Sequence, residues 1–318
     1  MFKRFSIILG AAGIIGLSSC AGNKGGGAEV TALSGSITID GSSTVYPISE
    51  AVAEEFRGVQ PDVNVALGES GTGGGMKKFS RGEIDICNAS RPIKEAEKAA
   101  CDSAGIKYLE LEIAFDGLAV MVNPKNTWVD KLTVAELKMI WESAAQGKIM
   151  TWNQVRPEWP TTELHLYGPG TASGTYEYFT EAICGKKGDS RGDYNANEDD
   201  NTLVNGIAGD AGALGYFGMA YYENNTDKLK IVPVDNNNGG VIPTVETVLN
   251  NTYSPLSRPL YIYINEKALA RPEVLAFVHF YLDNVETLSK EVGYVPLQAQ
   301  LYADMKAKLA AYDKPSAE

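Results

Sequence analysis

The chain has 318 residues, of which 44% are hydrophobic and 21% charged, and its formal net charge is −12 at pH 7. This composition is globular rather than disordered, and the length favours two domains of ordinary size. The acidic balance disfavours nucleic acid or an anionic membrane surface as a partner, because both repel a negatively charged protein.

The first 20 residues have the pattern of an export signal. Lys3 and Arg4 precede an apolar run over residues 5–17, and the sequence LSSC closes this run at Cys20. The run is too short to form a stable transmembrane helix. LSSC resembles a bacterial lipobox, which implies cleavage before Cys20 and attachment of lipid to that residue. A plain signal peptide with a chance cysteine is the alternative.

We therefore predict a lipoprotein signal peptide over residues 1–19 and a flexible, Gly-rich tether over residues 20–34. No other apolar run of the sequence is long enough to span a bilayer. We expect the mature protein to be extracytoplasmic, in the periplasm or at the cell surface, and to be attached to the membrane through its N-terminal lipid alone.

Three segments share one pattern, in which a short apolar strand leads through Gly, Ser and Thr residues into a helix with one apolar face. They are residues 36–56, 63–79 and 167–183. A helix start exposes unpaired N–H groups and the positive end of the helix dipole, and small residues let a ligand approach closely. Three converging helix starts would suit a small oxyanion. Ordinary Ser/Thr helix caps are the alternative.

The alternation of strands and helices predicts an α/β fold with largely parallel sheets. Two long apolar stretches, residues 108–124 and 257–265, are long enough to cross between domains. We predict domain I over residues 35–118 plus 255–318 and domain II over residues 119–254, with a hinged central cleft between them.

Nothing in the sequence favours catalysis, a metal or a cofactor. The small-residue loops match neither the Walker A loop nor the dinucleotide fingerprint, and GTASG misplaces its serine for a nucleophile elbow. The acidic loop over residues 193–204 lacks the glycine and the final glutamate of an EF-hand. No cysteine spacing resembles a zinc site. Cys87 and Cys101 either form a disulfide, which an exported setting permits, or remain buried free thiols.

Five motifs follow one another along the chain: DGSSTVYPI, GESGTGGGMKKF, DICNASRPIK, YGPGTASGTYEYFTEAI and SRPLYIYIN. Together they resemble the PstS family, the phosphate-binding proteins of the bacterial Pst ABC transporter, over residues 35–305. The branch with the pattern SR-x-DY-x-x-x-EDDN is the most similar, matched here by residues 190–194 and 198–201. The resemblance implies a monomeric periplasmic-binding protein of type II that closes on inorganic phosphate and delivers it to membrane permease subunits.

The resemblance also implies a set of phosphate ligands, carried over motif by motif. The first loop would supply hydroxyl groups and backbone N–H donors, the second a single hydroxyl from either of two residues, and the third hydroxyls and N–H groups at a helix start. In the order of these loops they are Ser43, Thr44 and Val45; Ser70 or Thr72; and Ser173, Gly174 and Thr175.

The sequence departs from the family at two places. Many relatives have Ala-Ser-Asp after the third strand, where the Asp accepts a proton from hydrogen phosphate and excludes sulfate; here Arg91 follows Ala89 and Ser90. Relatives also tend to carry an arginine shortly before Ser-Gly-Thr, and residues 168–172 contain none. We therefore expect Arg91 or Arg191 to meet the anion through its guanidinium. A surface ion pair is the alternative for each.

This replacement predicts a pH dependence. Without the acceptor, the cleft should favour dianionic phosphate, so that affinity rises between about pH 6 and pH 8. Sulfate should be rejected less strictly than by relatives with the Asp. An oxyanion-binding sensor or surface protein of the same fold is the main alternative function, and a phosphate-ester hydrolase is a further one.

Overall fold

The computed structural model describes residues 32–197 and 199–313. The predicted signal peptide, the lipidation site Cys20, most of the tether and Glu198 lie outside these residues. No helix of the described part has the length and hydropathy needed to cross a membrane.

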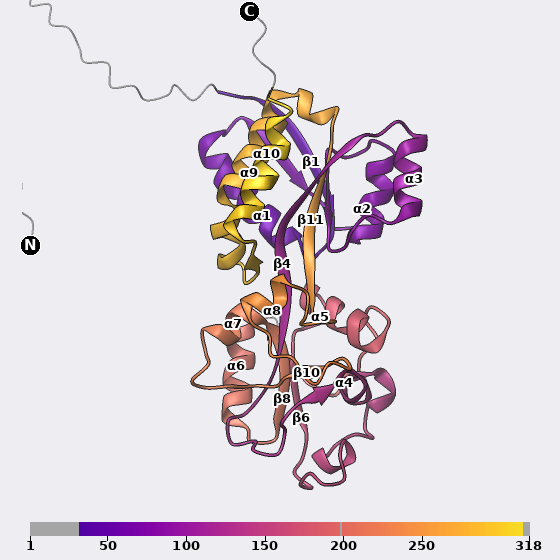
Figure 1. The fold of residues 1–318 in the computed structure, drawn as a ribbon, viewed down its shortest axis with the longest axis vertical. Helices are drawn as coiled ribbons and strands as arrows, with labels where there is room; N and C mark the ends of the chain where they lie inside the picture. The colour runs from indigo at the N-terminus through magenta and orange to yellow at the C-terminus, as the bar shows by residue number, and fades with distance from the viewer. Residues whose placement is uncertain (1–31, 198, 314–318) are drawn as a thin grey trace, which may run out of the picture. The chain divides into compact units, whose positions relative to one another are not determined.

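A mixed sheet runs through the body of the protein (Figure 1), in the strand order β2-β1-β3-β11-β4-β8-β6-β7, with β12 and β9 also paired to β4. Its strands are β1 Gly35–Gly41, β2 Val63–Leu67, β3 Ile86–Ala89, β4 Tyr108–Val122, β6 His165–Gly168, β7 Asn195–Ala196, β8 Ala213–Gly218, β9 Lys230–Ile231, β11 Ser257–Asn265 and β12 Val295–Pro296. The pairs β1–β2, β1–β3, β6–β7 and β6–β8 are parallel, as expected, whereas β4 pairs antiparallel with β11 and β8.

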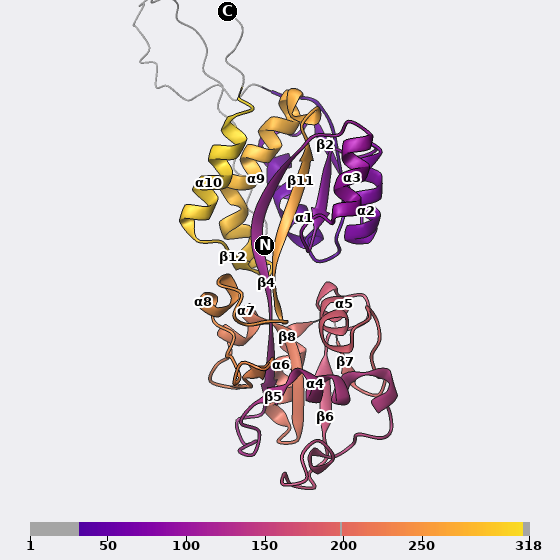
Figure 2. The same cartoon turned by 45° about the vertical axis from the view of Figure 1, so that its right-hand side comes forward.

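The two long apolar stretches form β4 and β11, which run side by side (Figures 1 and 2). β4 pairs with β11 as far as Gly117 and with β8 from Leu118 onward. We call the part built on β1–β3, β11 and β12 the first lobe, and the part built on β5–β10 the second lobe. Because β4 changes partner at these residues, we propose the predicted boundaries at 118/119 and 254/255 as the domain limits.

Helices cover both faces of the first-lobe sheet: α1 Tyr46–Val59, α2 Gly71–Ser80, α3 Glu95–Ser103, α9 Pro272–Glu291 and α10 Ala299–Ala310, with the short turn η4 Ala268–Ala270. Figure 1 shows α1, α9 and α10 on one side and α2 and α3 on the other. α1 buries Ile48, Val52 and Phe56, the three residues that the helical spacing predicts to share a face. The Phe56 ring meets Phe277 of α9 edge to face, with ring centroids 5.2 Å apart.

The second lobe contains short helices around an aromatic core: α4 Val134–Trp141, α5 Gly174–Phe179, α6 Asp200–Gly209, α7 Met219–Glu223, α8 Val245–Leu249, the turns η1 Ser143–Ala145 and η2 Trp152–Gln154, and the π-turn η3 Thr180–Cys184 that continues α5. Trp141, Trp152 and Trp159 are buried. The ring centroids of Trp141 and Tyr216 lie 4.8 Å apart. The Tyr216 ring stacks on the Phe179 ring, with centroids 3.6 Å apart.

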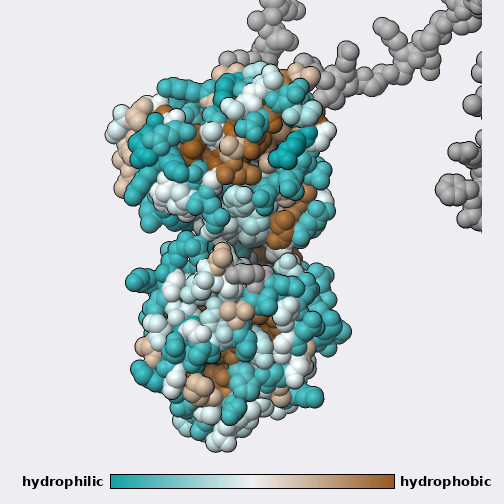
Figure 3. Space-filling model, turned by 180° about the vertical axis from the view of Figure 1, so that it is seen from behind, coloured by the Kyte–Doolittle hydropathy of each residue, from teal (hydrophilic) through white to brown (hydrophobic). Residues whose placement is uncertain are grey.

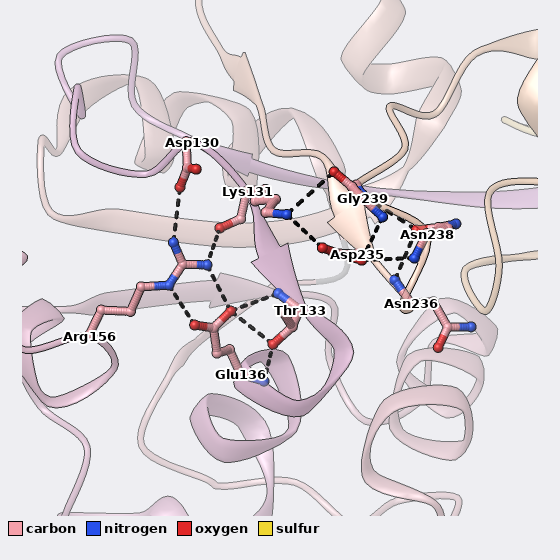
Figure 4. Close-up of polar contacts among 10 residues, drawn as sticks. Asp130, Lys131, Thr133, Glu136, Arg156, Asp235, Asn236, Asn238 and Gly239 are labelled. Atoms are coloured by element: carbon pink, nitrogen blue, oxygen red, sulfur yellow. Dashed lines mark hydrogen bonds and ion pairs between the residues drawn. The ribbon is translucent and has the colours of Figure 1, made fainter.

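Ion pairs hold the two-stranded pair β5 Leu132–Thr133 and β10 Val234–Asp235 in place (Figure 4). Arg156 Nε donates to Glu136 Oε1 at 2.6 Å, and Lys131 Nζ donates to Asp235 Oδ2 at 2.7 Å. Burial pulls the pKa of Glu136 upward, but the bonds from Arg156 and Thr133 hold it below its usual value. These polar groups satisfy one another, so we assign them a structural role.

Cys87, Cys101 and Cys184 are free and buried. The disulfide between Cys87 and Cys101 does not form, and the free-thiol alternative is the one that the structure contains. Burial raises the pKa of all three thiols, which keeps them protonated and unreactive near neutral pH.

Candidate functional site

A cleft with a volume of about 580 Å³ lies where the two lobes meet. The first lobe contributes the loops that follow β1, β2 and β3, and the second lobe contributes α5. The start of β11 forms the floor between them. The carboxyl ends of three neighbouring parallel strands lie at one edge of a sheet, so the fold itself brings the predicted loops together.

The loop after β1 turns sharply because of Gly41. Its φ is +142°, and a Cβ there would lie 2.1 Å from the carbonyl oxygen of Asn88. Ser42 N donates to that oxygen at 2.9 Å, and Ser42 Oγ accepts from Thr44 N at 3.2 Å. The turn leaves the Thr44 side chain at the cleft. The predicted backbone donor Val45 has a fully buried side chain, and its N–H donates to Ser42 O at 3.2 Å in this structure, so its bond to an anion stays a prediction.

The structure separates the two candidates in the second loop. Thr72 lines the cleft, where its Oγ1 accepts from Ser90 N at 3.1 Å. Ser70 instead donates its hydroxyl to Asp40 Oδ1 at 2.6 Å, and Asp40 also pairs with Lys78. Thr72 is therefore the cleft residue, and Ser70 serves to hold the start of α2.

The start of α5 packs against the first loop, and its residues Ser173, Gly174 and Thr175 do not line the cleft, whereas Glu177 and Tyr178 of the same helix do. Ser173 caps this helix, since its Oγ accepts from Thr175 N at 3.1 Å. A Cβ on Gly174 would lie 3.2 Å from both Cα and N of Thr44. A glycine at this position lets the two backbones approach closely, as the small-residue pattern predicts. Ser43 reinforces the approach, because its hydroxyl donates to Glu177 Oε2 of α5 at 2.7 Å.

Arg258, at the start of β11, is the cleft cation that the sequence reasoning missed. Its Nη2 donates to Thr44 Oγ1 at 2.8 Å, and its Nη2 and Nε lie 3.2 and 3.3 Å from Asp116 Oδ2. The guanidinium also stacks over the Tyr178 ring, 3.6 Å from its centroid. A signal was present in the sequence, since Asp116 and Arg258 are charged residues within the two apolar crossing stretches.

Asp116 is the buried partner of this cation. Its side chain is only 5% exposed. Burial raises the pKa of the carboxyl, and the charge and hydrogen bond of Arg258 oppose that shift. The pair holds the guanidinium at a fixed place beside Thr44, with a second face available in the cleft.

Arg91 lies in the cleft wall, but a carboxylate engages much of its guanidinium. Its Nη1 and Nη2 donate to Glu97 Oε2 and Oε1 at 2.9 and 2.7 Å. Burial pulls the pKa of Glu97 upward, and the Arg91 and Lys94 bonds hold it below its usual value. Arg91 therefore forms an ion pair within the wall of the cleft, and its contact with the anion stays a prediction.

Arg191 does not line the cleft, and the prediction that it meets the anion is wrong. Its side chain is buried, and its Nε and Nη2 donate to Asp193 at 2.5 and 2.8 Å. Its Nη1 donates to the carbonyl oxygens of Ile140 and Ile149. The hydrogen bonds that Asp193 accepts from the Arg191 side chain and from the Gly147 N–H lower its pKa to about 2. Arg191 joins α4 to the following loops and does not sit on the surface.

The charges that line the cleft favour an anion. Arg91, Lys94, Lys187 and Arg258 line it, against Glu177 and Glu181, so four cations face two carboxylates. Lys187 is ion-paired to Glu177. The described residues contain no group of three or more His, Cys, Asp and Glu that could hold a metal ion. The arrangement suits an oxyanion held by hydroxyls, N–H groups and a guanidinium.

The comparisons with known proteins agree with this geometry. A model of the PBP superfamily domain matches residues 26–285. The chain is 54% identical over 275 residues to Protein SphX of Synechococcus elongatus, covering 86% of this chain and 81% of SphX. It is 42% identical over 295 residues to the phosphate-binding protein PstS of Staphylococcus saprophyticus, covering 92% and 89%. The chain belongs to the PstS/SphX family of periplasmic-binding proteins.

Solved structures support the same placement of this PstS/SphX chain. A possible phosphate binding protein from Planctomyces limnophilus matches 89% of this chain and 100% of its own, at 47% identity and a TM-score of 0.85. A putative phosphate ABC transporter substrate-binding protein from Clostridium perfringens, solved with bound phosphate, matches 83% and 100% at 29% identity and a TM-score of 0.55. The family and the two-domain α/β fold expected from the sequence are confirmed.

Proposed function

We propose that this protein captures inorganic phosphate in the cleft between its lobes. The observation that carries the proposal is the convergence on Thr44 of the Arg258 guanidinium and the backbone of Gly174. These groups come from three separate elements: Arg258 donates to the Thr44 hydroxyl, and the backbone of Gly174 packs against the backbone of the same residue. Neutral donors contribute about 1 kcal/mol each, and more when the acceptor is charged. A set of this kind can hold a desolvated oxyanion.

The proposed ligands come from both lobes and from the floor of the cleft. Hydroxyls of the first lobe, the guanidinium at the floor and the N–H groups at the start of α5 would share the oxygens of the anion. They are Thr44, Thr72, Ser90 and Arg258 of the cleft lining, with Arg91 beside them, Ser43 once its bond to Glu177 exchanges, and the N–H groups of Gly174 and Thr175, which lie outside the lining in this structure. Closure about the crossing strands β4 and β11 would bring α5 onto the bound anion.

The transport role extends from the relatives. The Clostridium neighbour is named as a substrate-binding protein of a phosphate ABC transporter, and we propose the same role here: delivery of phosphate to permease subunits of the cytoplasmic membrane. The proposal includes an extracytoplasmic location and a lipid anchor at Cys20. It includes no catalytic step.

Calorimetric titration of ligand-free protein with phosphate, and then with sulfate, tests the binding proposal. We expect one phosphate per chain and weaker binding of sulfate. Turnover of a chromogenic phosphate ester would point to a hydrolase instead. Phosphate binding with no effect of gene deletion on phosphate uptake would point to a sensor.

A further inference from the structure

A second cavity of about 470 Å³ lies on the side of the crossing strands opposite the cleft. Figures 1 and 2 place α2, α3 and α5 on one side of the β4–β11 pair and α7, α8, α9 and α10 on the other. We call this second cavity the rear cavity. Both lobes line it, with α7 and α8 from the second lobe and the end of α9, β12 and the start of α10 from the first.

The wall of the rear cavity is largely apolar, and one carboxylate stands without a partner. Val245, Leu249, Val295 and Leu297 contribute apolar surface. Glu223 lies at the rim and has no hydrogen bond or ion pair among the described residues, and desolvation raises the pKa of its carboxyl. The other lining carboxylate, Glu286, already pairs with Lys290 at 3.7 Å. Figure 3 shows apolar surface, in brown, close to where the lobes meet on that side.

We propose that the rear cavity binds a small organic cation, an ammonium group on an apolar body, and that this binding favours the closed form of the cleft. Charge complementarity selects the occupant: an ammonium would pair with Glu223, and its apolar body would cover the Leu249 and Leu297 side chains. A neutral apolar molecule would offer the exposed Glu223 carboxylate no partner, and an anion would be repelled by it.

The coupling follows from the geometry of the two lobes. In this structure the lobes touch at the front, because Ser43 bonds to Glu177 and Thr44 abuts Gly174. Opening at the front about β4 and β11 would bring α7 and α8 toward β12 and α10 and narrow the rear cavity. A molecule in the rear cavity therefore opposes opening.

The chain also connects the two cavities directly. Val245 and Leu249 of α8 line the rear cavity, and the segment that follows them reaches the cleft at Asn251 and Arg258. A Cβ on Gly117 of β4 would lie 3.1 Å from Val248 Cγ2, so α8 rests on the strand where β4 changes partner. A shift of α8 would therefore also displace residues beside the proposed phosphate ligands.

Titration with phenethylammonium chloride, in the absence of phosphate, tests the site. We expect a dissociation constant of about 1 mM for the wild type, and at least tenfold weaker binding of uncharged 2-phenylethanol. Glu223→Gln should weaken ammonium binding at least fivefold, whereas Glu246→Gln, an exposed carboxylate of α8 outside the cavity lining, should not. Equal binding of the ammonium by wild type and Glu223→Gln, or no binding by wild type, overturns the site.

The coupling rests on the proposed phosphate function and is measured separately. At saturating phenethylammonium, phosphate affinity should rise about twofold to fivefold, and phosphate should tighten ammonium binding by the same factor. Leu249→Trp, or Val245→Phe if the first variant folds poorly, fills the cavity and should raise phosphate affinity without the ammonium. Unchanged phosphate affinity in these variants overturns the coupling. A chain that binds ammonium but no phosphate overturns only the proposed function.

Discussion

We expect the contact between Arg258 and Thr44 to contribute most to phosphate binding. Arg258 joins the cleft hydroxyl of Thr44 to the buried carboxylate of Asp116. Arg258→Met should lower phosphate affinity about 30-fold to 4,000-fold, because removing one partner of a desolvated charge pair costs about 2 to 5 kcal/mol. Calorimetry measures the change. Arg81→Met, which removes an exposed arginine paired with Glu83, is the control and should bind phosphate as the wild type does.

Asp193 provides a pH-dependent part of the stability. Its folded pKa of about 2 lies below the usual value of 3.8, so its stabilisation is present above pH 4 and is lost as the pH falls toward 2. Because Asp193 is an exposed residue, Asp193→Asn should lower the free energy of unfolding at pH 7 by about 1 kcal/mol, and about half of this deficit should be lost at pH 3.

Denaturant unfolding at the two pH values measures this difference, with the exposed Asp227→Asn as control. A deficit of the same size at pH 7 and pH 3 would contradict the role given to the Arg191–Asp193 pair.

At the residue scale, the sequence singled out Thr44 and Gly174 and left Ser70 and Thr72 open, because small and hydroxyl residues at helix starts suit an anion as well as an ordinary cap. Their contacts with phosphate stay predictions. The sequence did not predict which cation reaches them. Arg258 looks like one polar residue in a crossing strand, and its partner Asp116 is 142 positions away. Arg191 looked exposed among acidic neighbours, yet tertiary packing buries it. The expected rise of affinity between pH 6 and pH 8 stays a prediction, with Arg258 and Lys94 now among the cations of the cleft.

At the scale of elements, the start of α5 must pack against the Thr44 loop. In Gly174→Ala the new Cβ would meet backbone atoms of Thr44 at 3.2 Å, and overpacking of this size costs about 1 to 3 kcal/mol. We expect phosphate affinity to fall about fivefold to 100-fold. Thermal stability should change little, because alanine favours the helix.

Gly209→Ala is the matched control, since a Cβ at this last residue of α6 meets nothing within 4 Å. If both variants bind phosphate as tightly as the wild type, α5 does not close on the anion.

The three strand–loop–helix units were predictable because their periodicity and small residues are local signals. Which group each backbone N–H donates to could not be predicted, because this depends on how each loop turns. Val45 and Thr175 both follow small residues, yet the N–H of Val45 closes a turn onto Ser42 and that of Thr175 is capped by Ser173. The antiparallel pairing of β4 could not be predicted either, because a long apolar stretch has the same sequence pattern in a parallel and in an antiparallel strand.

At the scale of the whole molecule, we propose that the lipid anchor keeps the binding domain beside its permease. Cys20→Ala removes the proposed lipidation site, so the precursor should remain unlipidated and the protein should leave the membrane fraction. Fractionation of cells, with immunodetection of the protein, measures this change. Cys184→Ala is the control, because that thiol is buried in the second lobe. Membrane association that survives Cys20→Ala would refute the anchor.

The central claim is that the cleft between the lobes binds inorganic phosphate. Its most direct test is a calorimetric phosphate titration of wild-type protein freed of ligand by unfolding and refolding, alongside Thr44→Val. We predict one phosphate per wild-type chain, and at least tenfold weaker binding by Thr44→Val, which loses the hydroxyl that Arg258 and the anion share. Absence of phosphate binding by the refolded wild type, or equal affinity in the two proteins, would contradict the account.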